Sequence, residues 1–418
     1  MLRTKLLFLS VKLFFLESIK YLYHRDINKS FINFIEALSK YNIFYIKLFQ
    51  SIGTNTKLFN TIQREYLLKY LDNVPYDYNN IEENIISDII KLGEIDNNLL
   101  IDIDALQQIN TGLIAVVYKT KMLDKDIILK VKKRNIDNLV YNAIDEFELI
   151  INLLSKIPKL YFFYLKDIFL QSKKLLLEQL DFKNEICNIK TFYNNNETTE
   201  YVKIPFVYDS FTNQNSNIIV MEYLNGLKFI DLESINKIEY SKLISKFSLK
   251  SLLFNRIFHA DLHAGNIIFM EENKNKKLGI IDFGIVGNIS REEQNTCYKF
   301  IREIFINNDY KKATKILIEE ITKNIDNKNI FNIDSYCYDE IKIILEKQIK
   351  FSKDLDLYSC YELNKVLYKY NLKLLDCFYK LQYSIGTCYS VCINLSGDEP
   401  FLNNISDMSK DLLEFTIY

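Results

Sequence analysis

The amino-acid sequence predicts an α+β fold in which a small β-containing lobe and a larger helical lobe follow an N-terminal helical extension. Apolar positions recur with helical spacing through residues 1–98, and β-rich apolar runs separated by polar turns begin at about residue 99. The chain from residue 240 onward is mostly helical, and 48% hydrophobic and 26% charged residues are typical of a globular protein. We therefore expect an extension over 1–98, a first lobe over 99–224 and a second lobe over 225–418.

The start of the chain contains an apolar stretch, Leu6 to Leu16, which Lys12 interrupts and Glu17 follows. It is too short and too charged for a membrane-spanning helix, and it lacks the small-residue cleavage site of a signal peptide. We expect an amphipathic helix, and packing on the protein is favoured over contact with a membrane surface because most apolar helical stripes pack in a core.

The first lobe is expected to contain two antiparallel strand pairs that flank two helices. Polar turns separate the strands of each pair, and the helices show apolar residues at helical spacing. In chain order, these elements are strands 113–118 and 127–131, helices 138–157 and 164–194, and strands 206–211 and 218–223.

A charged loop in the second lobe carries the most informative residues of the chain. His259-Ala260-Asp261 leads to Asn266 five residues after the aspartate, and Asp282-Phe283-Gly284 follows. Apolar runs 266–270 and 278–282 predict a β-hairpin that brings Asn266 and Asp282 to neighbouring strand ends. This order is the one that phosphoryl transfer from ATP uses, with Asp261 as the catalytic carboxylate and Asn266 and Asp282 as ligands of Mg²⁺.

A lysine on the second predicted strand is the candidate for binding the α- and β-phosphates. Lys130 is flanked directly by apolar residues, as in the V-A-I-K motif, and Lys132 on the same strand face is its rival. The carboxylate partner is open among Glu146, Glu148 and Glu185, and ordinary kinase spacing favours the first two.

The loop before this lysine is expected to cover the phosphates, although it has one glycine where protein kinases have several. Glu222 and Tyr223 end the last predicted strand of this lobe and are expected to form the hinge whose backbone amides bind adenine. The predicted loop residues are Ile109, Asn110, Thr111, Gly112, Leu113, Ile114, Ala115, Val116 and Val117.

These motifs together resemble the UbiB/ADCK family of atypical kinases, and they indicate a bilobal protein-kinase-like fold. Each family motif has a counterpart in the chain over roughly residues 40 to 290. The family's H-A-D-P-H-P-G-N, L-D-F-G-x-V-G, E-L-D-F/Y-x-x-E-A-x-N and K-x-G-Q correspond to 259–266, 281–287, 179–188 and 47–50.

The resemblance implies an ATP- and Mg²⁺-dependent kinase or ATPase in which Glu185 is the partner of Lys130. It also implies that Lys47 and Gln50 belong to a regulatory helix over the site where a protein kinase binds its peptide. A lipid or quinone-precursor ligand, a role in quinone or isoprenoid lipid metabolism and peripheral membrane contact follow from the same resemblance.

The chain departs from the family pattern at several positions. Phe49 replaces the glycine of K-x-G-Q, Gln179 replaces the first acid of E-L-D, and both prolines of the catalytic loop are replaced, by Leu262 and Ala264. These departures leave two alternatives open, which are a Ser/Thr protein kinase and a catalytically silent nucleotide-binding module.

The segment after Asp282 also differs from that of protein kinases. Ala260 replaces the arginine of H-R-D, and no A-P-E motif follows. Ser290, with Glu293 three residues later, predicts the capping box of a helix, so a peptide-positioning platform is not expected.

Charge and cysteine usage limit the partners and the compartment. A net charge of −1 argues against a nucleic-acid ligand, and seven cysteines without a C-x-x-C pair argue against a zinc site. Reduced thiols, and hence a cytosolic or organelle-associated reducing compartment, are the simplest interpretation. The Tyr- and Phe-rich helices of 300–418 are expected to form core.

Overall fold

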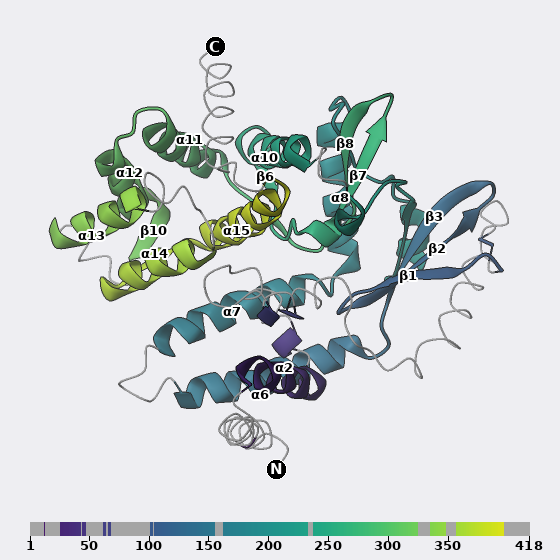
Figure 1. Ribbon diagram of the computed structural model, residues 1–418, viewed down its shortest axis with the longest axis horizontal. Coiled ribbons are helices and arrows are strands. Elements are labelled where there is room, and N and C mark those ends of the chain that lie inside the picture. The colour runs from purple at the N-terminus through teal and green to yellow at the C-terminus, as the bar shows by residue number, and fades with distance from the viewer. Residues whose placement is uncertain are drawn as a thin grey trace. The chain divides into compact units, whose positions relative to one another are not determined.

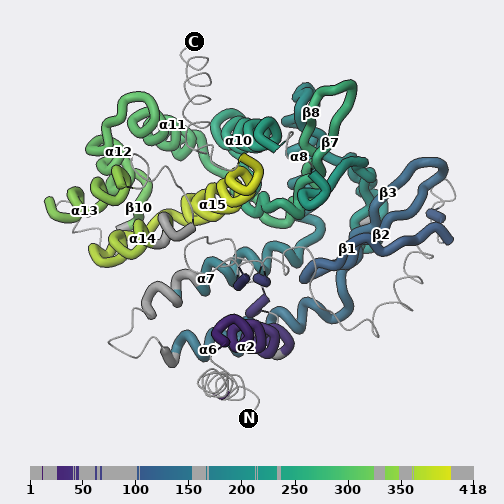
Figure 2. Tube along the Cα trace, in the orientation of Figure 1, coloured from purple at the N-terminus to yellow at the C-terminus, as the bar shows by residue number. Residues whose placement is uncertain are grey.

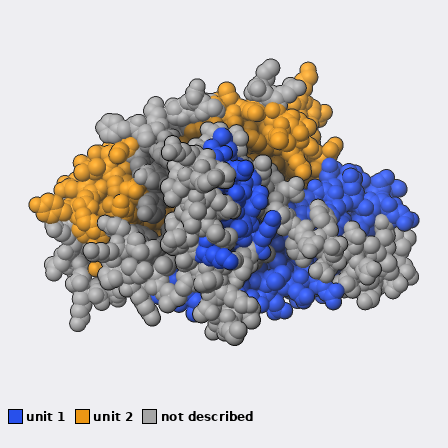
Figure 3. Space-filling model, turned by 60° about the horizontal axis from the view of Figure 1, so that its bottom comes forward, with its two compact units in different colours: residues 1–190, 205–223 blue, residues 191–204, 224–418 orange. Residues whose placement is uncertain are grey.

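The computed structural model groups the chain into two compact units, which Figure 3 colours separately. One unit comprises residues 1–190 and 205–223, and the other comprises residues 191–204 and 224–418. The structure describes residues 12, 26–42, 44–46, 62–63, 66–67, 101–102, 104–154, 162–232, 237–324, 335–347 and 357–396, and Figure 2 draws the remaining residues in grey.

The first unit combines helices with one four-stranded sheet (Figure 1). Its described elements are α2 (Ile27–Tyr41), β1 (Gln107–Thr111), β2 (Ala115–Met122), β3 (Lys125–Lys132), α6 (Ile136–Leu154), α7 (Phe162–Glu178), α8 (Phe182–Asn196), α9 (Asp209–Gln214) and β5 (Ile218–Glu222). Helix α8 begins in this unit, and its last residues belong to the other unit.

The sheet has the strand order β1-β2-β3-β5, and all neighbouring strands are antiparallel. The predicted first strand pair is therefore confirmed as β2 and β3, with Val117 opposite Lys130. Alternating residues of these strands, such as Val116, Leu129 and Val220, enter one buried cluster, which is the physical reason for their apolar alternation.

The predicted helix 164–194 is wrong, because two helices occupy this range. Helix α7 ends at Glu178, and α8 starts at Phe182 after a short turn. The Asp181 side chain accepts a 3.0 Å hydrogen bond from the backbone N–H of Asn184, as a helix-capping aspartate does. This cap marks the start of α8, and Glu185 lies in the first turn of that helix.

The predicted strand 206–211 is also wrong. Only Val207 bridges to Met221, and the chain then turns into helix α9 at Asp209. Strand β5, predicted as 218–223, is confirmed as a strand, but it pairs along its length with β3. Phe211 at the end of this stretch is 2% exposed within the sheet's apolar cluster.

The C-terminal end of helix α2 is hydrogen-bonded to α6 within the first unit. Asp26 caps its start by accepting from the N–H of Lys29. At its end, the Asn42 side chain donates hydrogen bonds to Ala143 O and to Glu146 Oε2, each 3.2 Å long. Helical residues thus occur in the predicted extension, whereas all of 6–16 except Lys12 lies outside the described residues.

The second unit contains most of the described helices of the C-terminal half and several short strands. Its elements are β4 (Val202–Lys203), η2 (Phe229–Asp231), α10 (Lys237–Leu253), β6 (Ile257–His259), η4 (Ala264–Asn266), β7 (Ile267–Glu272), β8 (Asn275–Ile280), β9 (Val286–Asn288), α11 (Arg291–Phe305), α12 (Tyr310–Ile316), the π-helical turn η5 (Leu317–Ile321), β10 (Thr322–Asn324), α13 (Ser335–Leu345), α14 (Leu357–Lys369), β11 (Leu372–Leu374) and α15 (Asp376–Ser396).

The predicted hairpin of this unit is confirmed as β7 and β8, which also pair with β4 in a three-stranded sheet. The strands are longer than expected, and the turn is confined to Asn273 and Lys274. Both residues have positive φ, 52° and 66°, which is the backbone of a two-residue type I′ turn.

The predicted capping box at Ser290 is confirmed. The Ser290 hydroxyl accepts from the N–H of Glu293, and the Glu293 carboxylate accepts from the N–H of Ser290, at 3.1 and 2.7 Å. Helix α11 therefore begins three residues after strand β9 ends at Asn288.

Candidate active site

The loop between β6 and β7 holds the motif residues in a hydrogen-bonded turn. The N–H of His263 donates to Asp261 O at 2.9 Å, and the N–H of Asn266 donates to His263 O at 3.0 Å. The N–H of Ala260 donates to Ile285 O, which attaches this loop to the segment after Asp282.

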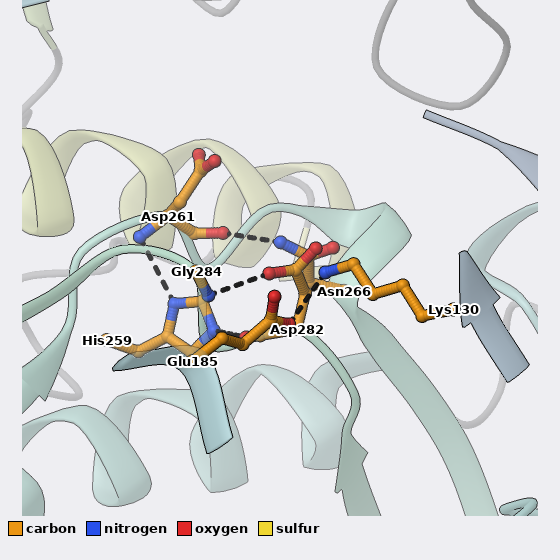
Figure 4. A network of polar contacts seen from close by, with 7 residues as sticks. All are labelled: Lys130, Glu185, His259, Asp261, Asn266, Asp282 and Gly284. Carbon is orange, nitrogen blue, oxygen red and sulfur yellow. Dashed lines mark hydrogen bonds and ion pairs between the residues drawn. The ribbon is translucent and has the colours of Figure 1, made fainter. Parts of the chain in front are cut away.

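His259 connects the two motif segments through its ring (Figure 4). Its Nδ1 accepts from the N–H of Asp261 at 3.1 Å, and its Nε2 contacts the carbonyl of Asp282. One neutral tautomer, protonated on Nε2, satisfies both contacts. Burial lowers the pKa of His259 below its usual value, which favours this neutral form.

Asn266 and Asp282 lie at neighbouring strand ends, as the hairpin predicts. The N–H of Ile281 donates to Asn266 O at 3.2 Å, so the two segments are joined at this point. The Asn266 amide nitrogen donates to Asp261 O at 2.8 Å, and Asp282 Oδ1 accepts from the N–H of Gly284 at 2.9 Å (Figure 4).

This donor set fits Mg²⁺. The Asn266 side-chain nitrogen is engaged with Asp261 O, which leaves the side-chain oxygen of Asn266 as the atom that could bind the metal. A carboxylate and an amide carbonyl are oxygen ligands of the kind that Mg²⁺ prefers, and Mg²⁺ usually completes its shell with water and phosphate oxygens.

The phenylalanine of Asp282-Phe283-Gly284 is fully buried in an aromatic cluster. The Phe283 ring centroid lies 4.9 Å from that of Phe192 and 5.3 Å from that of His259. Beside it, Gly287 has no room for a side chain, because a Cβ there would lie 2.0 Å from the Phe258 ring. Close packing thus holds the backbone that follows Asp282.

Helix α15 contacts this loop from far along the sequence. The Ser384 hydroxyl donates to His259 O at 2.7 Å, and Lys380 Nζ donates to Val286 O at 3.1 Å. Burial, together with the charge of Asp261, raises the pKa of the Tyr383 phenol well above its usual range, so this phenol stays protonated. Lys380 and Ser384, about one helical turn apart on α15, therefore hold the backbone after Asp282 and before Asp261.

In the first unit, Lys130 and Glu185 form an ion pair (Figure 4). Lys130 Nζ lies 2.6 Å from Glu185 Oε1, and their side chains are 12% and 1% exposed. The choice of Glu146 or Glu148 from ordinary spacing is wrong, because Glu146 accepts from Asn42 and Glu148 pairs with Lys173. Because α8 is a helix separate from α7, the partner of Lys130 is Glu185 in the first turn of α8.

The other lysines of this strand have different partners. Lys132 Nζ binds Asp137 at 2.7 Å and Leu180 O at 2.8 Å. Lys133 is 2% exposed, and its Nζ donates to Gly112 O at 2.7 Å. Burial lowers the pKa of Lys133 to about 8. Lys133 therefore holds the turn of the predicted phosphate-covering segment.

This segment is a tight hairpin rather than a loop over its whole length. Ile109, Asn110 and Thr111 belong to β1, and Ala115, Val116 and Val117 belong to β2. Only residues 112–114 turn, and the N–H of Gly112 donates to Ala115 O at 2.9 Å. Leu113 and Ile114 are each 7% exposed, because apolar side chains here pack into the unit.

The predicted hinge amides are engaged within the first unit. The N–H of Glu222 donates to Phe206 O at 2.8 Å, and the N–H of Tyr223 donates to Asp126 O at 3.3 Å. Adenine binding by these two N–H groups is therefore not supported, because strand pairing already occupies them. Lys47 and Gln50, predicted as regulatory, lie outside the described residues.

Sequence reasoning missed Lys133, Tyr383 and Ser384. Lys133 is one of three lysines within four residues, and nothing in the pattern marks it as buried. The two α15 residues lie more than a hundred positions from the loop that they support. Their only sequence signal is a polar pair within a largely apolar helix.

Comparison with known proteins agrees with this geometry. The ABC1 atypical kinase-like domain family matches residues 106–317. "Probable protein kinase UbiB" of Actinobacillus pleuropneumoniae is 28% identical over 305 residues, covering 68% of this chain and 53% of that protein. The chloroplastic "activity of BC1 complex kinase 8" of Arabidopsis thaliana is 25% identical over 185 residues, covering 42% of this chain and 24% of that protein.

A solved structure shows the same fold. Rv3197 of Mycobacterium tuberculosis, determined with erythromycin, superposes with a TM-score of 0.50 and 16% identity, covering 95% of this chain and 98% of that one. The fold is α+β and protein-kinase-like, as predicted, and the class is that of atypical kinases. The chain belongs to the ABC1 atypical kinase-like family, which is the UbiB/ADCK family predicted from its motifs. It spans about half the length of the UbiB relative.

Proposed function

We propose that this atypical kinase binds Mg-ATP and transfers or hydrolyses the γ-phosphate. The observation that carries the proposal is the buried ion pair between Lys130 and Glu185, with 2.6 Å between Nζ and Oε1. In kinases such a pair orients the lysine that binds the α- and β-phosphates.

The second set of residues supplies the remaining roles. Asp261 positions the attacking nucleophile or accepts its proton, while Asn266 and Asp282 hold Mg²⁺, which neutralises charge on the phosphates when bound. His259 fixes the Asp261 N–H and the Asp282 carbonyl in one arrangement. The family and the order of the motifs support the proposal that the Lys130–Glu185 pair and the group of Asp261, Asn266 and Asp282 act on one nucleotide.

The phosphate acceptor is a separate proposal. The early start of α11 at Arg291 leaves eight residues between Asp282 and the helix, so little chain is available there to position a peptide. This favours a small-molecule acceptor or water over the Ser/Thr protein kinase alternative. A link to quinone or isoprenoid lipids and a peripheral membrane contact rest on the resemblance alone. None of the helices in the described residues is long and apolar enough to cross a membrane.

The experiment compares Lys130→Met with Lys125→Met, a matched change at an exposed position on the same strand. Nucleotide binding and ATP turnover are measured with and without Mg²⁺. We expect Lys130→Met to lower turnover roughly a hundredfold or more and Lys125→Met to leave it near wild type. Binding of ATP by wild type without any turnover would instead support the silent nucleotide-binding alternative.

A further inference from the structure

The helical part of the second unit encloses an apolar cavity of about 200 Å³. Its walls come mainly from α10, α11, α14 and α15, and include Leu249, Ile301, Leu363, Leu381 and Ile385. Figure 1 shows α10 in teal, α11 in green, and α14 and α15 in yellow-green to yellow. Protein interiors are usually packed with few voids larger than a water molecule, so a space of this size is unusual.

The polar side chains at the wall already have partners in the protein. Ser245 bonds to Ser241 O, Gln382 exchanges hydrogen bonds with Asn364, and Ser384 donates to His259 O. A water molecule needs two to four polar partners to reside in a cavity. This wall therefore suits an apolar molecule better than water.

The volume sets the size of the occupant. A cavity of roughly 150 Å³ lined by aliphatic and aromatic side chains binds benzene and stays free of water. At about 200 Å³, this cavity has room for an uncharged ring with a short alkyl substituent or a branched hydrocarbon of similar size. The described residues that line it include no charged side chain, so an ionised ligand group would lose its solvation without gaining a partner among them.

Two wall residues connect the cavity to the catalytic loop. Ser384 lines it and donates to His259 O at 2.7 Å. Phe258 lines it from the neighbouring position of β6, and its ring fills the space that a side chain at Gly287 would need. An occupant of the cavity would therefore touch side chains that hold the loop on both sides of Asp261 and Asp282.

We propose that this cavity is a binding site for a small uncharged apolar molecule, and that its occupancy steadies the catalytic loop. Binding does not depend on the proposed function, whereas an effect on turnover rests on it. The predicted role of the helices of 300–418 as core then describes only part of what they do.

The test uses n-butylbenzene as the probe and thermal unfolding of the full chain as the readout. Cys297→Phe and Ile301→Phe place extra volume in the cavity from helix α11, while Cys187→Phe makes the same change at an exposed thiol. We expect a saturable rise of about 2 to 4 °C in the Tm of wild type and Cys187→Phe. Both cavity-filling variants should show no such rise.

The two parts of the proposal fail separately. An unchanged Tm for wild type, or an equal rise in folded cavity-filling variants, would overturn the binding site. If the probe binds and ATP turnover is present, we expect turnover to change at least twofold in wild type and not in Ile301→Phe. Unchanged turnover with saturated binding would overturn the coupling and leave the binding site intact. A chain without turnover that still gains the probe-dependent Tm rise supports the site while contradicting the proposed function.

Discussion

At the scale of single residues, the motif positions could be read from sequence because their spacing is local. Asp261 and Asn266 are five residues apart on one loop, and the hairpin that brings Asp282 beside them is short. The partner of Lys130 could not be chosen from the residues alone. It lies 55 positions away, and the choice depends on a helix break that only the capping of Asp181 explains.

Lys133 gives a pH-dependent prediction. Its pKa is lowered from 10.5 to about 8 in the folded protein, so between these values the unfolded chain binds a proton that the folded chain has released. Wild-type stability should therefore rise, relative to Lys133→Met, as pH increases from 8 to 10.5. The gain should be on the order of 2 to 3 kcal/mol.

Denaturant unfolding at pH 7.5, 9 and 10.5 measures this difference. Lys125→Met, at an exposed position, provides the control and should track wild type. A wild-type advantage that shrinks with rising pH would mean that Lys133 is charged and stabilised in the folded state.

At the scale of elements, sequence patterns predicted β2, β3, β5, β7 and β8, but they missed β1 and the shortest strands. Strands β4, β6 and β9 have two or three residues, too few to show a period of two. The range 206–211 has the composition of a strand, yet helix α9 begins there at Asp209. Phe211 is buried from this helix, so its apolar side chain does not distinguish a strand from a helix.

The capping box of α11 predicts a measurable stability effect. Ser290→Ala removes the hydroxyl that accepts from the Glu293 N–H, and the free energy of unfolding should fall by about 1 kcal/mol. Ser216→Ala, at an exposed turn position, should change it by much less. Equal values for the two variants in urea unfolding would argue that the box is energetically unimportant.

Helix α15 predicts an effect on catalysis without contact to substrate. Ser384→Ala removes the donor to His259 O, so we expect kcat to fall several-fold with little change in the KM for ATP. Ser390→Ala on the same helix is the control. If KM changes and kcat does not, Ser384 acts on binding rather than on the loop.

At the scale of the whole molecule, the family and the fold were readable because several motifs occur in one order. Ordered motifs survive where identity is low, as it is against the UbiB relative at 28%. The support that α15 gives the catalytic loop was not readable, because this helix lies beyond the residues that the family matches. The arrangement into an extension and two lobes over 1–98, 99–224 and 225–418 stays a prediction.

The cysteines illustrate the same limit. None of the seven, all of which lie within the described residues, forms a disulfide. Burial and a hydrogen bond to Glu293 raise the pKa of Cys377 to about 12, which makes its thiol a poor nucleophile. Composition predicted reduced thiols, but only the fold shows which of them are buried and unreactive. The compartment itself stays a prediction.

The most direct measurement is Mg²⁺-dependent ATP turnover by the purified chain beside Asp282→Ala, with Asp145→Ala at an exposed helical position as the matched control. We predict turnover that requires Mg²⁺, falls by roughly a hundredfold or more in Asp282→Ala and is unchanged in Asp145→Ala. Turnover in folded Asp282→Ala equal to that of wild type would contradict the assignment of this aspartate and of the phosphoryl-transfer site.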